Sequence, residues 1–361
     1  MRRPAEWPGM PFARPLYALI KPVGARCNLS CRYCYYPMPK GRRPVLMSDD
    51  LLALFTRQYI AAQTQREVLF TWHGGEPTLL PLTFYERALA LQRRWAGWHV
   101  CDNALQTNGT LLSDDWCRFL AANRFLVGIS LDGPQPVHDA WCGQGSWERV
   151  MRGIDLLERH GVEWNVMAVV HEGNVQDAHA FYRFFREIGC TFLQFTPLFR
   201  TPHQAGLSPE AWGTFLCTLF DEWYAQDVGK VFVQLFEATL ANWCGVPPGV
   251  CTLSPACGDA LVVEADGNVY SCDHFVQRAY LLGNLRQQPL TAMAYGNKQQ
   301  TFRQRKTLLP AECLGCAWRF ACHGECPANR RKGGASYLCQ GYRQFFAHVA
   351  PAMEQLAEQF G

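Results

Sequence analysis

Residues 27–34 read Cys-Asn-Leu-Ser-Cys-Arg-Tyr-Cys, a C-x3-C-x2-C pattern that directly follows the strand-like apolar segment at residues 16–20. No fourth cysteine and no histidine lies nearby, whereas a structural zinc site takes four protein ligands. Three thiolates on a tight loop suit an iron–sulfur cluster in which one iron stays open to another ligand. The spacing therefore predicts a cluster held by Cys27, Cys31 and Cys34.

The composition of the whole chain limits what the cysteines can do. The sequence has 361 residues, of which 48% are hydrophobic and 18% charged, and its formal net charge is +3. This balance argues against a polybasic nucleic-acid-binding protein and against disorder. Residues 1–24 lack the apolar run of a signal peptide, and no stretch approaches the ~20 apolar residues of a membrane span. We therefore expect a cytoplasmic protein with no membrane partner, whose 17 cysteines are metal ligands or free thiols rather than disulfides.

A second group of cysteines lies in the last third of the chain. Setting Cys244 aside, it provides eight thiols, enough for two sites of four. From ligand type alone, zinc and iron–sulfur clusters fit such sites equally well. The eight are Cys251, Cys257, Cys272, Cys313, Cys316, Cys322, Cys326 and Cys339. The scattered cysteines have apolar neighbours and are expected to be ordinary buried thiols; they are Cys101, Cys117, Cys142, Cys190 and Cys217.

Short apolar runs alternate with segments of helical period in the first two thirds of the chain. The expected strands are residues 16–20, 68–72, 126–130, 164–170 and 192–195, and the expected helices are 82–95, 113–123 and 147–161, with another opening at 48. This alternation predicts parallel βα units wound as an open sheet or as a full or partial barrel. Functional groups then belong at the C-terminal ends of the strands, where the distinctive turns at residues 73–77, 106–109 and 131–134 fall.

The C-terminal region has a different pattern. Helices are expected from residue 208 towards 224 and over residues 231–243, and the tail from residue 340 onward reads as an amphipathic helix. Two short apolar runs joined by an Asp-Gly turn predict a β-hairpin directly before Cys272. We divide the chain into an N-terminal tail (1–15), a barrel (16–230), and a linker helix with a cysteine-rich domain (231–361).

Together these motifs resemble those of the radical S-adenosylmethionine enzymes. The likeness rests on the three-cysteine loop, with Tyr33 before its third cysteine, and on the Gly-Gly-Glu-Pro turn at residues 74–77. The downstream cysteines resemble a SPASM domain with two auxiliary four-iron clusters, and within that group the sequence is most similar to the anaerobic sulfatase-maturating enzymes. The resemblance implies an α/β fold, a partial (β/α)6 TIM-like barrel followed by a SPASM domain that carries the β-hairpin and two auxiliary iron–sulfur clusters.

The resemblance also implies cofactors and residue roles. S-adenosylmethionine would bind the open iron of the first of three [4Fe-4S] clusters. Its contacts would be Tyr33, Gly74, Gly75, Glu76, Ser130 and Phe199. One auxiliary cluster would be held by Cys251, Cys257, Cys272 and Cys326, and the other by Cys313, Cys316, Cys322 and Cys339.

The implied reaction oxidises a Cys or Ser of a sulfatase polypeptide to Cα-formylglycine, with an electron donor such as flavodoxin or ferredoxin. Asp273 would take the proton from the substrate thiol or hydroxyl, while a 5′-deoxyadenosyl radical removes hydrogen from the adjacent carbon. One alternative is a related SPASM enzyme that forms a thioether or carbon–carbon crosslink in another peptide. The other is a non-catalytic zinc-binding adaptor, against which the three-cysteine loop argues.

Two positions depart from the family pattern. The segment after His138 is shorter than in the family and lacks an arginine that there reaches the carboxylate of the cofactor; Arg149 and Arg152 are candidates to replace it by proximity. His73 stands where the family commonly has glutamine. Both departures bear more on the identity of the substrate than on the type of reaction.

Overall fold

The computed structural model describes residues 16–36, 45–200, 205–258 and 260–360. The N-terminal tail predicted at residues 1–15 lies outside this range. Within it, ten strands form one sheet in the order β10-β9-β8-β1-β2-β3-β4-β5-β6-β7. The six central strands run parallel. They are β1 (Tyr17–Lys21), β2 (Glu67–Trp72), β3 (Val100–Thr107), β4 (Leu126–Ser130), β5 (Trp164–Val170) and β6 (Phe192–Pro197).

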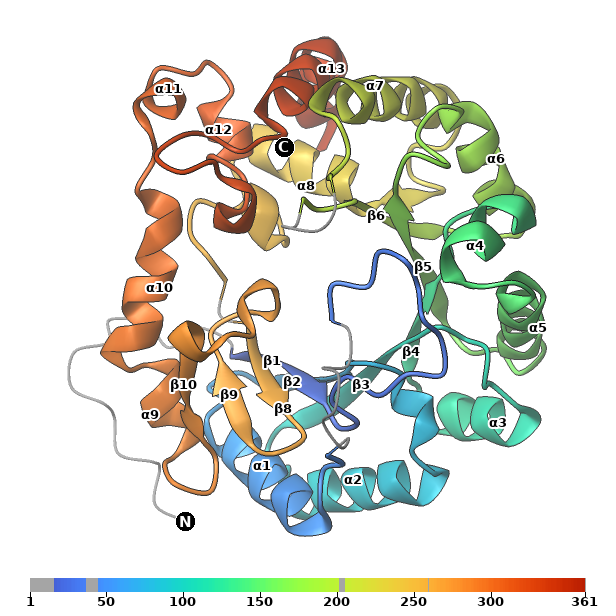
Figure 1. The fold of residues 1–361 in the computed structure, drawn as a ribbon, viewed down its shortest axis with the longest axis vertical. Coiled ribbons are helices and arrows are strands. Elements are labelled where there is room, and N and C mark those ends of the chain that lie inside the picture. The colour runs from blue at the N-terminus through green and yellow to red at the C-terminus, as the bar shows by residue number, and fades with distance from the viewer. Residues whose placement is uncertain (1–15, 37–44, 201–204, 259, 361) are drawn as a thin grey trace.

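Helices alternate with these strands along the chain and lie outside them (Figure 1). Two of them begin at a serine cap: the hydroxyl of Ser48 accepts from the backbone N–H of Leu51, and that of Ser113 accepts from the N–H of Trp116. The helices are α1 (Asp49–Ala61), α2 (Leu82–Trp95), α3 (Asp114–Ala122), α4 (Gln135–Cys142), α5 (Ser146–Arg159) and α6 (Ala178–Glu187). The predicted partial (β/α)6 barrel is confirmed.

The predicted hairpin is present, and it extends the barrel sheet. Strand β8 (Ala260–Glu264) pairs parallel with β1, β9 (Asn268–Tyr270) pairs antiparallel with β8, and β10 (Leu281–Asn284) completes the edge. The sheet therefore continues across the domain boundary proposed after residue 230. Cys272 lies just after β9, and the side chain of the next residue, Asp273, forms an ion pair with Lys21, the last residue of β1.

The segment predicted to be helical from residue 231 differs at its start. Phe232 and Val233 form strand β7 (Phe232–Val233), which pairs with Phe192 and Leu193 of β6. Only from Gln234 does the chain become helical. An apolar, β-prone pair adjacent to an open sheet edge gains ladder hydrogen bonds there, which outweighs the local helical pattern.

The remaining helices cover the open side of the barrel and the cysteine-rich region. They are α7 (Pro209–Gln226), α8 (Gln234–Trp243), α9 (Leu290–Ala294), α10 (Asn297–Thr307), α11 (Ala311–Leu314), α12 (Arg319–Cys322) and α13 (Cys339–Phe360). Short 3-10 turns occupy Pro77–Leu79, Cys251–Leu253, Asp273–Phe275, Arg278–Tyr280 and Pro327–Asn329. Helix α13 packs on α7 where Gly213 and Gly341 meet: a Cβ on Gly341 would lie 2.2 Å from the carbonyl oxygen of Pro209.

The core lies between the sheet and its helices and is rich in buried aromatic side chains, among them Tyr59, Phe70, Trp72 and Tyr85. Tyr59 and Phe70 meet edge to face with ring centroids 5.0 Å apart. Among the helices of the described residues, none combines the length and the apolar character needed to cross a membrane.

Candidate active site

The cluster loop, residues 27–34, is tied to the Gly-Gly-Glu-Pro turn by the backbone just before it. The N–H of Gly75 donates to the carbonyl of Gly24, and the N–H of Glu76 donates to that of Arg26, each at 2.8 Å. A Cβ on Gly75 would lie 2.0 Å from the carbonyl oxygen of Arg26, so any larger residue would push the two segments apart. The turn predicted as a cofactor contact thus also fixes where the cluster loop begins.

The three loop cysteines are accessible thiols. Cys27 and Cys34 are exposed and Cys31 is half-buried. The backbone N–H of Leu29 points at the Sγ of Cys27 at 3.4 Å, and the N–H of Cys34 donates to the carbonyl of Cys31 at 3.1 Å. Three reachable thiols on one compact loop are a donor set that fits a four-iron cluster with one iron left for another ligand.

Glu76 is fully buried and its carboxylate is saturated by protein donors. It accepts from the N–H of Thr78 at 2.9 Å and from that residue's hydroxyl, from the hydroxyl of Thr107 at 2.7 Å and from the N–H of Asn108 at 2.7 Å. These bonds join the Gly-Gly-Glu-Pro turn to the C-terminal end of β3. The contact of Glu76 with the ammonium group of S-adenosylmethionine stays a prediction.

Tyr33 leaves the cluster loop towards the ends of β4 and β5. Its hydroxyl donates to the carboxylate of Asp132 and lies 3.1 Å from the Sγ of Cys142, while its ring stacks near Trp141 and His171. Cys142 stands four residues after His138, at the position where the family resemblance implies an arginine.

Ser130 stands at the end of β4 and accepts from the side-chain amide of Gln106 at 3.1 Å. Like Tyr33, it lies at the C-terminal edge of the sheet, and its contact with S-adenosylmethionine stays a prediction.

The two arginines suggested as replacements lie on α5. Arg149 donates to the carbonyl of Gly145 at 3.2 Å and is exposed, and Arg152 is exposed as well. A different cation, Arg32 of the cluster loop, lies over the ring of Trp141 with 5.0 Å to the centroid.

The carboxylate of Asp273 lies next to the C-terminal end of β1, because it forms an ion pair with Lys21, the last residue of that strand. The Nζ of Lys21 is 2.5 Å from Oδ1 of Asp273, the Lys21 side chain is fully buried, and that of Asp273 is 15% exposed. The hydroxyl of Tyr35, just after the cluster loop, donates to Oδ2. Burial alone would raise the pKa of Asp273, but the charge of Lys21 and the hydrogen bonds from Lys21 and Tyr35 outweigh it and hold the pKa at about 2. The carboxylate is therefore ionised and acts as an acceptor.

Glu264 and Tyr36 extend this polar group. The hydroxyl of Tyr36 donates to Oε2 of Glu264, and the ring of Tyr36 lies under the Lys21 ammonium with 3.5 Å from Nζ to the centroid. Sequence reasoning missed Lys21, Tyr35, Tyr36 and Glu264. The sequence does contain a sign of the role of Lys21, because this residue is the only charged one in the otherwise uncharged strand β1 and stands at its C-terminal end.

Phe199 contacts the residue that follows Asp273. Its ring meets that of His274 edge to face at 4.9 Å between centroids, and Nδ1 of His274 is 3.6 Å from the Sγ of Cys326. Phe199 thus lies between the barrel and one auxiliary cysteine set. Its contact with the adenosyl group stays a prediction.

The first auxiliary set surrounds Cys272. Burial, followed by the Cys251 thiol, the Asp273 carboxylate and the Cys257 thiol, raises the pKa of Cys272 to about 12. Burial, Glu325 and the thiols of Cys251 and Cys272 raise the pKa of Cys326. Thiols that lie near enough to raise one another's pKa, and that burial disfavours as free thiolates, are a fitting donor set for a four-iron cluster.

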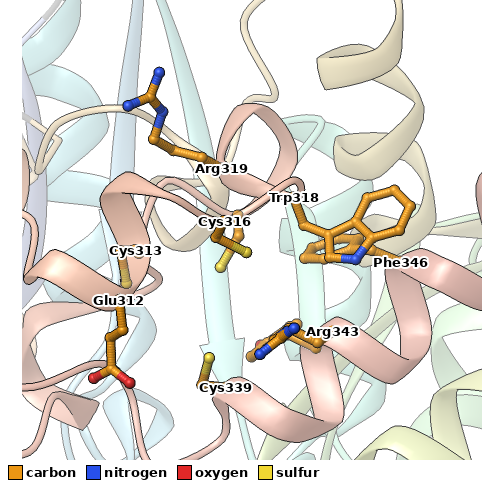
Figure 2. A pocket seen from close by; sticks show the side chains of 11 residues that line it. Glu312, Cys313, Cys316, Trp318, Arg319, Cys339, Arg343 and Phe346 are labelled. Atoms are coloured by element: carbon orange, nitrogen blue, oxygen red, sulfur yellow. The ribbon is translucent and has the colours of Figure 1, made fainter.

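The second auxiliary set lines a cavity between α11, α12 and the start of α13. Figure 2 shows Cys313, Cys316 and Cys339 around this space, which Cys322 also lines. Burial, then the thiols of Cys313 and Cys316, raises the pKa of Cys339. Cysteines of each proposed set thus lie near one another, and their division into two sets of cluster ligands, which the family resemblance implied, stays a prediction.

The comparisons with known proteins agree with this geometry. Residues 22–185 match the radical SAM superfamily, and residues 251–317 match the SPASM iron–sulfur cluster-binding domain. A solved structure of native anSMEcpe with bound AdoMet superposes with a TM-score of 0.90 at 31% identity, covering 96% of this chain and 100% of that one. Streptococcus suis SuiB, at 14% identity and a TM-score of 0.67, covers 91% of this chain and 78% of its own and shares the fold.

Curated relatives are similar over nearly the whole chain. The serine-type anaerobic sulfatase-maturating enzyme of Bacteroides thetaiotaomicron is 48% identical over 97% of this chain and 93% of its own length. The cysteine-type enzyme of Clostridium perfringens is 33% identical over 95% and 98%. The chain therefore belongs to the anaerobic sulfatase-maturating enzymes, radical S-adenosylmethionine proteins with a SPASM domain.

Proposed function

We propose that this protein oxidises a residue of a sulfatase polypeptide to Cα-formylglycine, and that this residue is serine. One observation carries the proposal: the open three-thiol loop and the ionised carboxylate of Asp273 lie at the same end of the barrel, joined through Tyr35. A radical source and a proton acceptor at one place are what the oxidation of an alcohol to an aldehyde needs.

The reaction removes one hydrogen atom, one proton and one electron from the substrate side chain. When bound, S-adenosylmethionine and its cluster supply the carbon radical that takes the hydrogen atom from the substrate Cβ. Cys27, Cys31 and Cys34 would hold that cluster, and Tyr33, Ser130, Phe199 and the Gly74–Glu76 backbone would orient the cofactor.

Asp273 would accept the hydroxyl proton. Its ion pair with Lys21 keeps the carboxylate charged and limits its orientation, and Tyr35 donates to the other side of the same group. Because Asp273 follows Cys272 directly, the substrate carbon that it serves would lie close to the first auxiliary cysteine set.

The eight C-terminal cysteines would hold two clusters, and these clusters would accept and pass on the released electron. Two sets of four thiols leave no iron open, so clusters bound there suit electron transfer rather than substrate binding. An external donor such as flavodoxin or ferredoxin would reduce the first cluster.

Serine is favoured as the substrate residue because the serine-type relatives are more similar to this chain than the cysteine-type relative is. The serine-type enzymes of Bacteroides thetaiotaomicron and Klebsiella aerogenes are 48% and 41% identical to this chain, whereas the cysteine-type enzyme of Clostridium perfringens is 33% identical. We also place the reaction in the cytoplasm, supported by the 17 free cysteines, which a reducing compartment maintains.

The test uses the full chain, reconstituted with iron and sulfide under anaerobic conditions and reduced. It is incubated with S-adenosylmethionine and sulfatase peptides that differ only in Ser, Cys or Ala at the target position. We expect the Ser peptide to lose the mass of two hydrogens and to react with an aldehyde reagent, and the Ala peptide to remain unchanged.

Two results would contradict the proposal. Release of 5′-deoxyadenosine with no change in the Ser or Cys peptide would favour a SPASM enzyme that modifies another peptide. A protein that takes up zinc but no iron would support the adaptor alternative instead.

A further inference from the structure

Three neighbouring strands end in a row of polar side chains. Strands β8 and β1 pair in register with Glu264 beside Lys21, and β1 and β2 pair with Ile20 beside Trp72. One residue further, the N–H of His73 donates to the carbonyl of Ile20 at 2.8 Å, which sets His73 beside Lys21. Register partners in a parallel sheet face the same side, so Glu264, Lys21 and His73 form one row at the C-terminal edge of the barrel.

Two members of this row already have a charged or hydroxyl partner. Lys21 pairs with Asp273, and Glu264 accepts from Tyr36. His73 is half-buried and lies near enough to Asp273 and Lys21 for their charges to affect its pKa, which burial lowers from its usual value. The ring is therefore neutral near neutral pH and can be reached from the site.

The backbone selects the tautomer of this neutral ring. The N–H of Gly74 donates to Nδ1 of His73 at 2.7 Å, so Nδ1 carries a lone pair. The proton must then be on Nε2, which becomes a hydrogen-bond donor. Among the described residues, no acceptor is hydrogen-bonded to this N–H.

We propose that His73 is a specificity-determining residue, whose Nε2–H donates to the Oγ of the substrate serine while that hydroxyl donates to Asp273. A hydroxyl oxygen is a good acceptor and a thiol sulfur is a weak one, so this hydrogen bond favours serine over cysteine. The proposal deepens the proposed function and rests on it, because it concerns the same substrate residue.

The experiment measures kcat/KM for matched Ser and Cys peptides in reconstituted wild-type enzyme and in two variants. His73→Leu removes the donor at similar volume, and His73→Gln offers an amide N–H in its place. We expect the Ser-to-Cys ratio of kcat/KM to fall about tenfold or more in His73→Leu, as the loss of one such hydrogen bond implies, and to recover at least partly in His73→Gln.

A structural role for His73 is separated by two further readouts. Iron content and 5′-deoxyadenosine release should match those of a control, His179→Leu, whose wild-type side chain is exposed and contacts Glu222 instead of the site. If kcat/KM in His73→Leu fell equally for both peptides or did not change, the Ser-to-Cys ratio would stay the same. That result would overturn the role of His73 and leave the proposed function standing. Wild-type enzyme that forms formylglycine from neither peptide would overturn both.

Discussion

The cluster loop and the C-terminal cysteine region use the same side chain for different purposes. The loop has three thiols, two of them exposed, held by backbone hydrogen bonds to a glycine turn. Cys244 aside, the C-terminal region has eight, of which only Cys251 is exposed, and we assign them to two sets of four. With these ligand sets, the number of protein ligands would separate a cluster that can bind a reactant from clusters that can only pass electrons.

The two regions are joined by a few polar contacts. Lys21 of β1 pairs with Asp273, which follows Cys272, and Tyr35, which follows Cys34, donates to the same carboxylate. The proposed proton acceptor is therefore placed by both cysteine regions together.

Removal of a loop cysteine should have the largest effect. Cys31→Ala should abolish 5′-deoxyadenosine release, because two thiols do not hold the open cluster, and iron should fall by about four from about twelve per chain. Iron analysis and chromatography of the reaction products check this. Cys101→Ala, a half-buried cysteine outside both regions, serves as the control and should retain full iron. Normal cofactor cleavage in Cys31→Ala would remove the distinction between the two regions.

Asp273→Asn should have the next largest effect. An amide keeps the size of the carboxylate but accepts a proton poorly, so formylglycine formation should fall about 10²-fold or more. Iron content and 5′-deoxyadenosine release should persist, measured on the same sample. Loss of iron in this variant would mean that Asp273 supports the auxiliary set structurally.

A cysteine of the second auxiliary set should matter less to radical formation than a loop cysteine does. Cys316→Ala should lower iron by about four and slow formylglycine formation by roughly tenfold, while 5′-deoxyadenosine is still released. Product and cofactor cleavage are quantified in parallel. If cofactor cleavage stopped as completely as in Cys31→Ala, the C-terminal thiols would not be a separate electron path.

Tyr36→Phe should have the smallest effect. It removes the hydroxyl that donates to the half-buried carboxylate of Glu264, and we expect a loss of about 1–2 kcal/mol in the free energy of unfolding. Urea unfolding of the reconstituted protein under anaerobic conditions measures it. The control is Tyr224→Phe, which loses only an exposed hydrogen bond to Gln355 and should leave the free energy of unfolding nearly unchanged. Phe275→Leu would not serve as a control, because the ring of Phe275 packs on Phe302.

Much of the site could be predicted from local patterns. The spacing of Cys27, Cys31 and Cys34 predicts an open cluster because three thiols in eight residues must share one loop, whatever the rest of the fold. The strand and helix pattern predicts parallel βα units, which the family resemblance narrows to a partial barrel, and α2 begins and ends at the predicted residues. The family resemblance, rather than spacing, divided the eight C-terminal cysteines into two sets.

What the sequence determined by itself was the chemistry of the donors: thiols at fixed spacings, a carboxylate after a cysteine, and glycines at strand ends. The tertiary structure alone decided which of them meet. Lys21 and Asp273 are far apart in the chain and become partners only because β8 adds to the edge of β1. Such pairing depends on non-local ladder hydrogen bonds and on burial of the lysine, and neither leaves a periodic signal in the sequence.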